Sequence, residues 1–174
     1  MIKLTRNTAP DKLTEEFVKK GTEKYKNTKE SVWNVDWLKE ALLDMSNQKC
    51  AYCEGRLDLK SDYMEVEHFR DKKDYPNDVL IWENLLPSCK HCNGNKSSHD
   101  VVSEPIINPF VDVPREHIFL KSYLYKPKDE LGKSTIDVLD LNDCTRLVIA
   151  RCTLGTEINK RLEDRLNEIK DGLT

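Results

Sequence analysis

Two Cys-x-x-Cys pairs constrain the fold of this chain more than any other feature. The segments KCAYC and SCKHC bring four thiols into two short knuckles, each of which can grip one edge of a metal ion. Four thiolates in a tetrahedral arrangement are typical of structural zinc. We therefore predict a single zinc ion held by Cys50, Cys53, Cys89 and Cys92. The alternative is a set of buried cysteines without a metal.

The start of the chain, MIKLTRNTAPDK, lacks the apolar core of a signal peptide, and no stretch approaches the roughly 20 apolar residues of a membrane helix. We therefore expect a cytoplasmic protein that does not enter the membrane. Disulfides are disfavoured in that compartment, which supports metal binding by the paired cysteines. The remaining two, Cys144 and Cys152, are expected to be buried as small apolar side chains. His91 is an alternative zinc ligand, but four thiolates already fill the site.

The charge balance counts against a tight, autonomous DNA-binding protein. The formal net charge is -3, whereas non-specific affinity for DNA comes mainly from Lys and Arg. A nuclease whose metal neutralises the phosphate, or whose partner holds the DNA, remains compatible with this charge. A length of 174 residues, 34% of them charged and 38% hydrophobic, predicts one folded domain, residues 1–174.

Hydrophobic patterning divides this domain into three parts. In the helical part, residues 1–49, we expect one helix over 10–25 and another from a Ser31 cap to the first cysteine pair. The central part, 50–99, should contain a strand over 63–69 and a short helix near Asn93.

In the third part, residues 100–174, we expect a hairpin of IFLKSYLY and STIDVL joined by KPKDELGK. A helix should then run from an Asn142 cap to Lys170, with Gly155 as a possible break. Four large apolar residues of the terminal helices could lie in the core or at an interface with a partner. We expect the core, where large apolar side chains usually lie: Trp33, Trp37, Leu147 and Ile158.

The segment between the cysteine pairs carries the candidate chemistry. Histidine titrates near neutrality, so a neutral imidazole can take a proton from water, and we assign this role to His68. Phosphodiester hydrolysis also needs a cation to neutralise charge, and one divalent metal can supply it. The oxygen-bearing side chains near His68 favour a hard cation, Mg²⁺ or Mn²⁺, at a site separate from the zinc.

The order of these residues resembles the HNH endonucleases: an acidic residue and histidine, a central asparagine in an N-L-L context, Cys-x-x-Cys, and Asn-x-x-Lys. More narrowly, EHFRDK, IWENLLPSCKHCNGNK, INPFVDVPREH and LDLND look like the PtuB-like HNH proteins of Septu and retron-associated anti-phage defence. The likeness covers roughly residues 50–151. One departure is Asp71, where the group has proline; this bears on the loop and on any phosphate contact by Arg70.

The resemblance implies roles for individual residues. Glu67 and Asn93 would bind the catalytic metal, and Asn84 would orient His68 by pinning the connecting loop. Lys96 would contact a phosphate, with an exposed surface lysine as the alternative.

Three further residues are weaker candidates for the catalytic site. Glu65 is the weaker of the two acidic candidates in the strand. His99 is a competing metal ligand, although about six residues of helix would carry it roughly 9 Å from Asn93. His117 is expected to be structural or exposed.

Together these features predict an α+β protein with a ββα-metal (HNH) finger inside a four-cysteine zinc-knuckle frame, flanked by N- and C-terminal helices. The resemblance implies cleavage of DNA to 5′-phosphate and 3′-hydroxyl ends, with a PtuA-like ATPase as partner. The alternative is a non-catalytic zinc-binding module that binds nucleic acid or protein.

Overall fold

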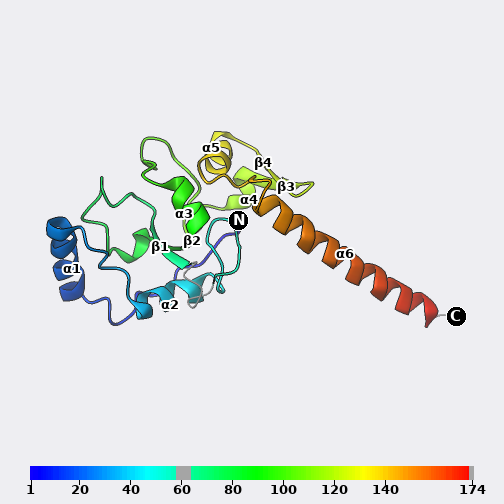
Figure 1. Cartoon of the computed structure of the whole chain (residues 1–174), viewed down its shortest axis with the longest axis horizontal. Coiled ribbons are helices and arrows are strands. Elements are labelled where there is room, and N and C mark those ends of the chain that lie inside the picture. The colour runs from blue at the N-terminus through cyan, green and yellow to red at the C-terminus, as the bar shows by residue number, and fades with distance from the viewer. Residues whose placement is uncertain (58–63, 173–174) are drawn as a thin grey trace.

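The computed structural model describes residues 1–57 and 64–172 and shows a mixed body of helices and strands from which one long helix projects (Figure 1). The two-stranded sheets are each antiparallel. The chain runs through α1 (Glu15–Thr28), α2 (Asp36–Met45), β1 (Met64–His68), the 3-10 helix η2 (Trp82–Asn84), β2 (Leu85–Cys89), α3 (Lys90–Lys96), α4 (Pro114–His117), β3 (Ile118–Lys121), β4 (Leu124–Pro127), α5 (Glu130–Val138) and α6 (Leu147–Asp171).

Both N-terminal helices form, but each begins later than the pattern predicts. The Thr14 hydroxyl accepts a hydrogen bond from the backbone N–H of Phe17 and caps α1, whose first residue, Glu15, comes five residues after Pro10. Ser31 does not cap α2, because turns occupy the chain up to Val35, whose N–H bonds the carbonyl of Trp33. Tyr63, the first residue of the expected central strand, lies outside the described residues.

The centre of the molecule is a hairpin followed at once by a helix. In the register of β1 and β2, Glu67 lies opposite Leu86 and His68 opposite Leu85. Cys89 ends β2 and caps α3. This β1–β2–α3 unit is the ββα arrangement expected from the sequence, and α2 packs on its strands over a core rich in leucine.

The expected C-terminal hairpin is wrong in its second strand. The hairpin closes within IFLKSYLYKP, where Ser122 and Tyr123 have φ of 49° and 64°, typical of a type I′ turn. Instead, STIDV forms the last part of α5 and Leu139 follows as its C-cap, because the Asp129 carboxylate accepts the N–H of Gly132 and starts a helix there.

The final helix, α6, also begins later than expected. The Asn142 side chain bonds both backbone groups of Tyr125, at 2.8 and 2.9 Å, and therefore ties the hairpin instead of capping a helix. Gly155 does not break α6; a Cβ there would lie 2.4 Å from the Tyr123 ring, so glycine permits this approach. None of the residues that the structure describes in α6 is buried.

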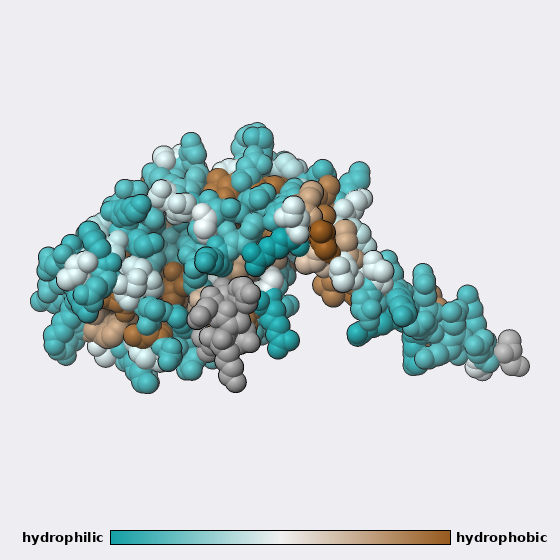
Figure 2. All heavy atoms as spheres, viewed as in Figure 1, coloured by the Kyte–Doolittle hydropathy of each residue, from teal (hydrophilic) through white to brown (hydrophobic). Residues whose placement is uncertain are grey.

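Two expectations about burial need correction. Cys144 is exposed and Cys152 only half-buried, so the buried setting expected for them is wrong. Trp33 is buried in the core, whereas Ile158 on α6 is 48% exposed. Figure 2 shows apolar side chains gathered where α6 leaves the body. Among the described residues, no helix combines the length and the hydropathy needed to cross a bilayer.

Candidate active site and cysteine cluster

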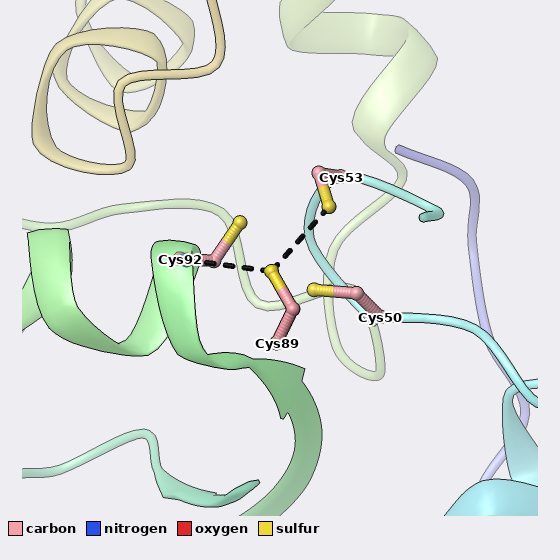
Figure 3. A group of neighbouring side chains, drawn as sticks. All are labelled: Cys50, Cys53, Cys89 and Cys92. Carbon is pink, nitrogen blue, oxygen red and sulfur yellow. Dashed lines mark hydrogen bonds between the residues drawn. The ribbon is translucent and has the colours of Figure 1, made fainter. Parts of the chain in front are cut away.

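The four paired cysteines meet in one cluster (Figure 3). All four sulfur atoms lie within 4.8 Å of one another, and Cys53 Sγ lies 3.8 Å from Cys89 Sγ. In a tetrahedral site with Zn–S bonds of about 2.3 Å, neighbouring sulfurs are about 3.8 Å apart. The cysteines are thus clustered like a zinc knuckle, and their donor set and spacing fit such an ion.

Backbone hydrogen bonds hold the two knuckles together. The N–H of Ala51, within the first knuckle, donates to the carbonyl of Pro87 on β2 at 2.9 Å. In the second knuckle, Cys89 Sγ accepts the N–H of Cys92 at 3.5 Å. Burial opposes the thiolate form of Cys50, but hydrogen bonds from the other three cysteines hold its pKa well below the usual range. The hydrogen bonds with Cys50 in turn raise the pKa of Cys53 and Cys92, so the four thiols share the negative charge unequally.

His68 ends β1 and is 3% exposed. Its Nε2 lies 3.0 Å from the carbonyl oxygen of Val79. A carbonyl only accepts hydrogen bonds, so Nε2 carries the proton and Nδ1 of the neutral ring is the acceptor. The ring also packs edge-on against Trp33, with centroids 4.4 Å apart. Burial lowers the pKa of His68 to about 4, so the imidazole is neutral near pH 7.

Asn84 connects the loop after β1 to the turn before η2. Its Oδ1 accepts the N–H of Arg70 at 2.7 Å, and its Nδ2 donates to the carbonyls of Arg70 and Asp78, at 3.1 and 3.2 Å. Asp78 precedes Val79, whose carbonyl bonds the His68 ring. The side chain thus pins the loop segment from which His68 takes its orientation.

Arg70 and Asp71 begin that loop. The guanidinium of Arg70 is 4.2 Å from the Tyr75 ring centroid and pairs with Asp78 at 3.2 Å, while 47% of the side chain stays exposed. Asp71, where the resembling group has proline, is buried; its carboxylate accepts the N–H of Lys73 at 2.8 Å. An aspartate turn therefore shapes the loop, and Arg70 remains reachable from solvent.

Lys96 lies neither at a phosphate-accessible surface nor in solvent, so both sequence-based alternatives are corrected. Its side chain is 0% exposed, and Nζ lies 2.7 Å from Glu67 Oε1 and 3.0 Å from the carbonyl of His68. The Tyr52 hydroxyl also donates to Glu67 Oε1, at 3.4 Å. Burial raises the pKa of Glu67 to about 7, although the ammonium of Lys96 opposes this shift. Glu67 is thus engaged in an internal ion pair.

Glu65 and Asn93 lie together at the wall of a cavity of about 310 Å³. Asn93 Nδ2 donates a hydrogen bond to Glu65 Oε2. Trp33, Lys39 and Lys72 line the same cavity. The sequence analysis missed both lysines, since no spacing links residues from three separate segments.

The other histidines lie apart from these groups. His99 Nε2 bonds the carbonyl of Glu104 at 2.7 Å, and His117 Nδ1 pairs with Asp129 at 2.6 Å. His91 Nδ1 faces Asp143 at 3.9 Å. Within the described ranges, none of the three belongs to the cysteine cluster or lines the Glu65–Asn93 cavity.

Comparison with known proteins defines the class of this site. Residues 50–99, which span both knuckles and the β1–β2–α3 unit, match the family model described as HNH endonuclease, so the chain contains an HNH domain. It is 52% identical to a Septu protein PtuB from Bacillus thuringiensis over 95% of the chain and 64% of that protein. A Septu protein PtuB from Bacillus mycoides (strain KBAB4) is 30% identical over 79% of the chain and 56% of that protein. The chain thus spans less than two thirds of the length of either relative.

Proposed function

We propose that this chain is a metal-dependent HNH endonuclease that hydrolyses phosphodiester bonds in DNA as the effector of an anti-phage defence system in the cytoplasm. The observation that carries the proposal is the state of His68: a neutral imidazole whose Nε2–H is fixed on Val79, which leaves Nδ1 as a proton acceptor. The HNH domain and the similarity to Septu proteins support the defence role.

The chemistry divides between two groups of residues. Cys50, Cys53, Cys89 and Cys92 would hold a structural zinc that joins the knuckles. Asn93 and a carboxylate of β1 would hold Mg²⁺ or Mn²⁺, since amide and carboxylate oxygens suit a hard cation. Family resemblance assigns the carboxylate role to Glu67. When bound, the cation would neutralise charge on the scissile phosphate and its leaving oxygen.

The protein's own side chains would position and deprotonate the attacking water. His68 Nδ1 takes a proton from this water, and Asn84 keeps the loop that orients the ring in place. Arg70, half of whose side chain is exposed, would contact a neighbouring phosphate. The buried Lys96 would position the end of β1 by its contacts with Glu67 and the carbonyl of His68.

A non-catalytic zinc module is the rival function. Such a module would have no need of a buried, neutral histidine whose tautomer is fixed. Incubation of supercoiled plasmid with the zinc-loaded chain and Mg²⁺ or Mn²⁺ distinguishes the nuclease from the non-catalytic module. We expect nicked circles with 5′-phosphate and 3′-hydroxyl ends; a module that only binds DNA would shift the plasmid without cutting it.

We further propose that a PtuA-like ATPase supplies the DNA affinity that the chain lacks. The net charge is -3, and α6 presents large apolar side chains to solvent, including Leu154, Ile158 and Leu162. Co-purification and size-exclusion chromatography should show a complex, and the partner should increase cleavage at physiological salt. Tight DNA binding by the isolated chain, with a cleavage rate that the ATPase leaves unchanged and no complex, would contradict this.

A further inference from the structure

We propose that Arg56 and Arg146 form a phosphate-binding site between the first cysteine knuckle and the start of α6, and that this site takes a backbone phosphate of DNA. The choice of DNA rests on the proposed nuclease function. The observation that carries the site is a cavity of about 330 Å³ that both arginines line. Neither His68 nor Asn93 lines it, so a phosphate bound there is not the one that is cleaved.

Two segments that are far apart in the sequence bring the arginines to one cavity. Arg56 follows the first knuckle, and its backbone pairs with Lys49 in a short antiparallel bridge. Arg146 directly precedes α6, and its carbonyl accepts the N–H of Ala150 at 3.1 Å. The two arginines are 90 positions apart (146 minus 56). The bridge and the helix thus fix the backbone at both sides of the cavity.

No carboxylate opposes the positive charge of this cavity. Within residues 1–57 and 64–172, no acidic side chain lines it and neither guanidinium is in an ion pair. The nearby carboxylate of Glu54 pairs with the amino group of Met1 at 2.6 Å. That of Asp143 accepts the N–H and the hydroxyl of Thr145, each at 2.7 Å. The cavity is therefore positive in a chain whose net charge is -3.

The chemistry of the lining suits an oxyanion. A guanidinium presents its N–H donors as a planar fork that matches two oxygens of a phosphate or a carboxylate, and it stays charged at neutral pH. Phosphate is the group that a nuclease substrate offers at every nucleotide. The volume lies at the lower end of small-ligand sites, about 300–1,000 Å³. Leu147 and Ala150, in the first turn of α6, add an apolar wall on which a sugar can pack.

A larger cavity beside α1 shows why lysines alone do not make such a site. It measures about 600 Å³ and is lined by three lysines, two of which pair with Glu16 and Glu30 at 2.6 and 2.5 Å. Most of its positive charge is thus already neutralised. Lysine also lacks the two-pronged donor geometry of arginine. The cavity of Arg56 and Arg146 has neither disadvantage.

The alternative role for the two arginines is to offset the charge of the cysteine cluster, because Cys53 and Cys89 line the same cavity (Figure 3). Four thiolates around a divalent zinc leave two negative charges. Among the described residues, however, no hydrogen bond joins either guanidinium to a sulfur; Cys53 and Cys89 contact each other and the N–H of Cys92. Both arginines are exposed, so their donors are available to a ligand from solvent.

The test is the binding of a fluorescein-labelled DNA duplex to the full, zinc-loaded chain at low salt and without a catalytic cation. We expect Arg56→Gln/Arg146→Gln to weaken binding about tenfold and to reduce the slope of log affinity against log salt by about two, roughly one for each lost contact. Arg115→Gln/Lys121→Gln removes the same charge from exposed residues outside the cavity. This matched control should bind within about threefold of wild type, because distant charges act only through the overall field.

Zinc content and melting temperature are measured on every variant and should match wild type. The proposal is overturned if the double arginine variant binds DNA like wild type, if the control weakens binding equally, or if zinc is lost together with DNA binding. Titrations with inorganic phosphate and ATP distinguish the source of the phosphate: loss of either ligand with DNA binding intact would overturn the assignment to DNA. Since no cation is present, these results do not depend on cleavage, whereas absence of plasmid nicking would overturn the nuclease function.

Discussion

Replacement of His68 by alanine is expected to reduce DNA cleavage by about 10²–10⁴-fold, the usual loss when a general base is removed. The reason is geometric: the Val79 carbonyl fixes the proton on Nε2, so Nδ1 is the atom that can accept a proton from water. Zinc content should remain unchanged, because the ring lies outside the cysteine cluster. Nicking rates under saturating Mg²⁺ or Mn²⁺ measure the effect.

Because the His68 ring is buried, a second variant is needed to separate loss of the base from loss of stability. Alanine leaves a cavity beside Trp33 and an unpaired Val79 carbonyl, so part of any loss would come from the fold. His68→Gln retains a side-chain amide that can donate to Val79 but offers no comparable base. It should cleave as slowly as the alanine variant while melting nearer to wild type. His117→Ala is the control, because this half-buried ring contacts Asp129 and lies outside the candidate site. Wild-type cleavage by both His68 variants would rule out this base.

Cys89→Ser is expected to remove the zinc and to unfold the centre of the molecule. Structural zinc contributes an apparent 10–16 kcal/mol or so in zinc-finger peptides, which is comparable to the whole stability of a typical domain, about 5–15 kcal/mol. Cys89 ends β2 and caps α3, so its loss acts on both elements. Elemental analysis should find about one zinc per chain in wild type and far less in the variant, with a lower melting temperature.

The matched control for this experiment is Cys144→Ser, because Cys144 is exposed and lies outside the cluster. It should retain zinc and melt like wild type. A wild-type protein without zinc, together with a Cys89→Ser protein that melts like it, would contradict the metal centre.

The parts of the fold that local sequence determines were predictable. Each cysteine pair is a tight knuckle, and the β1–β2–α3 order follows from the residues between and just after the pairs. The C-terminal hairpin was not, because its turn places Ser122 and Tyr123 at positive φ, where glycine or asparagine is the usual signal. The alternating pattern of STIDVL predicted a strand, but the segment is helical because the Asp129 side chain caps a helix that begins just before it.

Membership of the candidate site stays a prediction, and the contacts among its residues could not be predicted from the sequence. Residue types and order suggested His68, Asn84 and Asn93 as site residues. They did not reveal that Lys96 folds back from α3 onto Glu67, a contact across 29 residues of sequence (96 minus 67). Nor did they reveal that Glu65 meets Asn93, since Glu65 and Glu67 lie on the same face of β1 and the strand pattern alone does not say which residue of α3 each one contacts.

Metal-dependent nicking of supercoiled plasmid by the zinc-loaded chain tests the central claim most directly. The protein is assayed with Mg²⁺ or Mn²⁺, then with a chelator in modest excess over the added metal, then after the metal is restored, while elemental analysis follows the zinc. We predict nicking that stops on chelation and returns with the metal at constant zinc content, and that is lost in His68→Gln. The account would be contradicted if neither metal supports nicking, whether the chain is alone or with its ATPase. It would also be contradicted if His68→Gln nicks plasmid as fast as wild type.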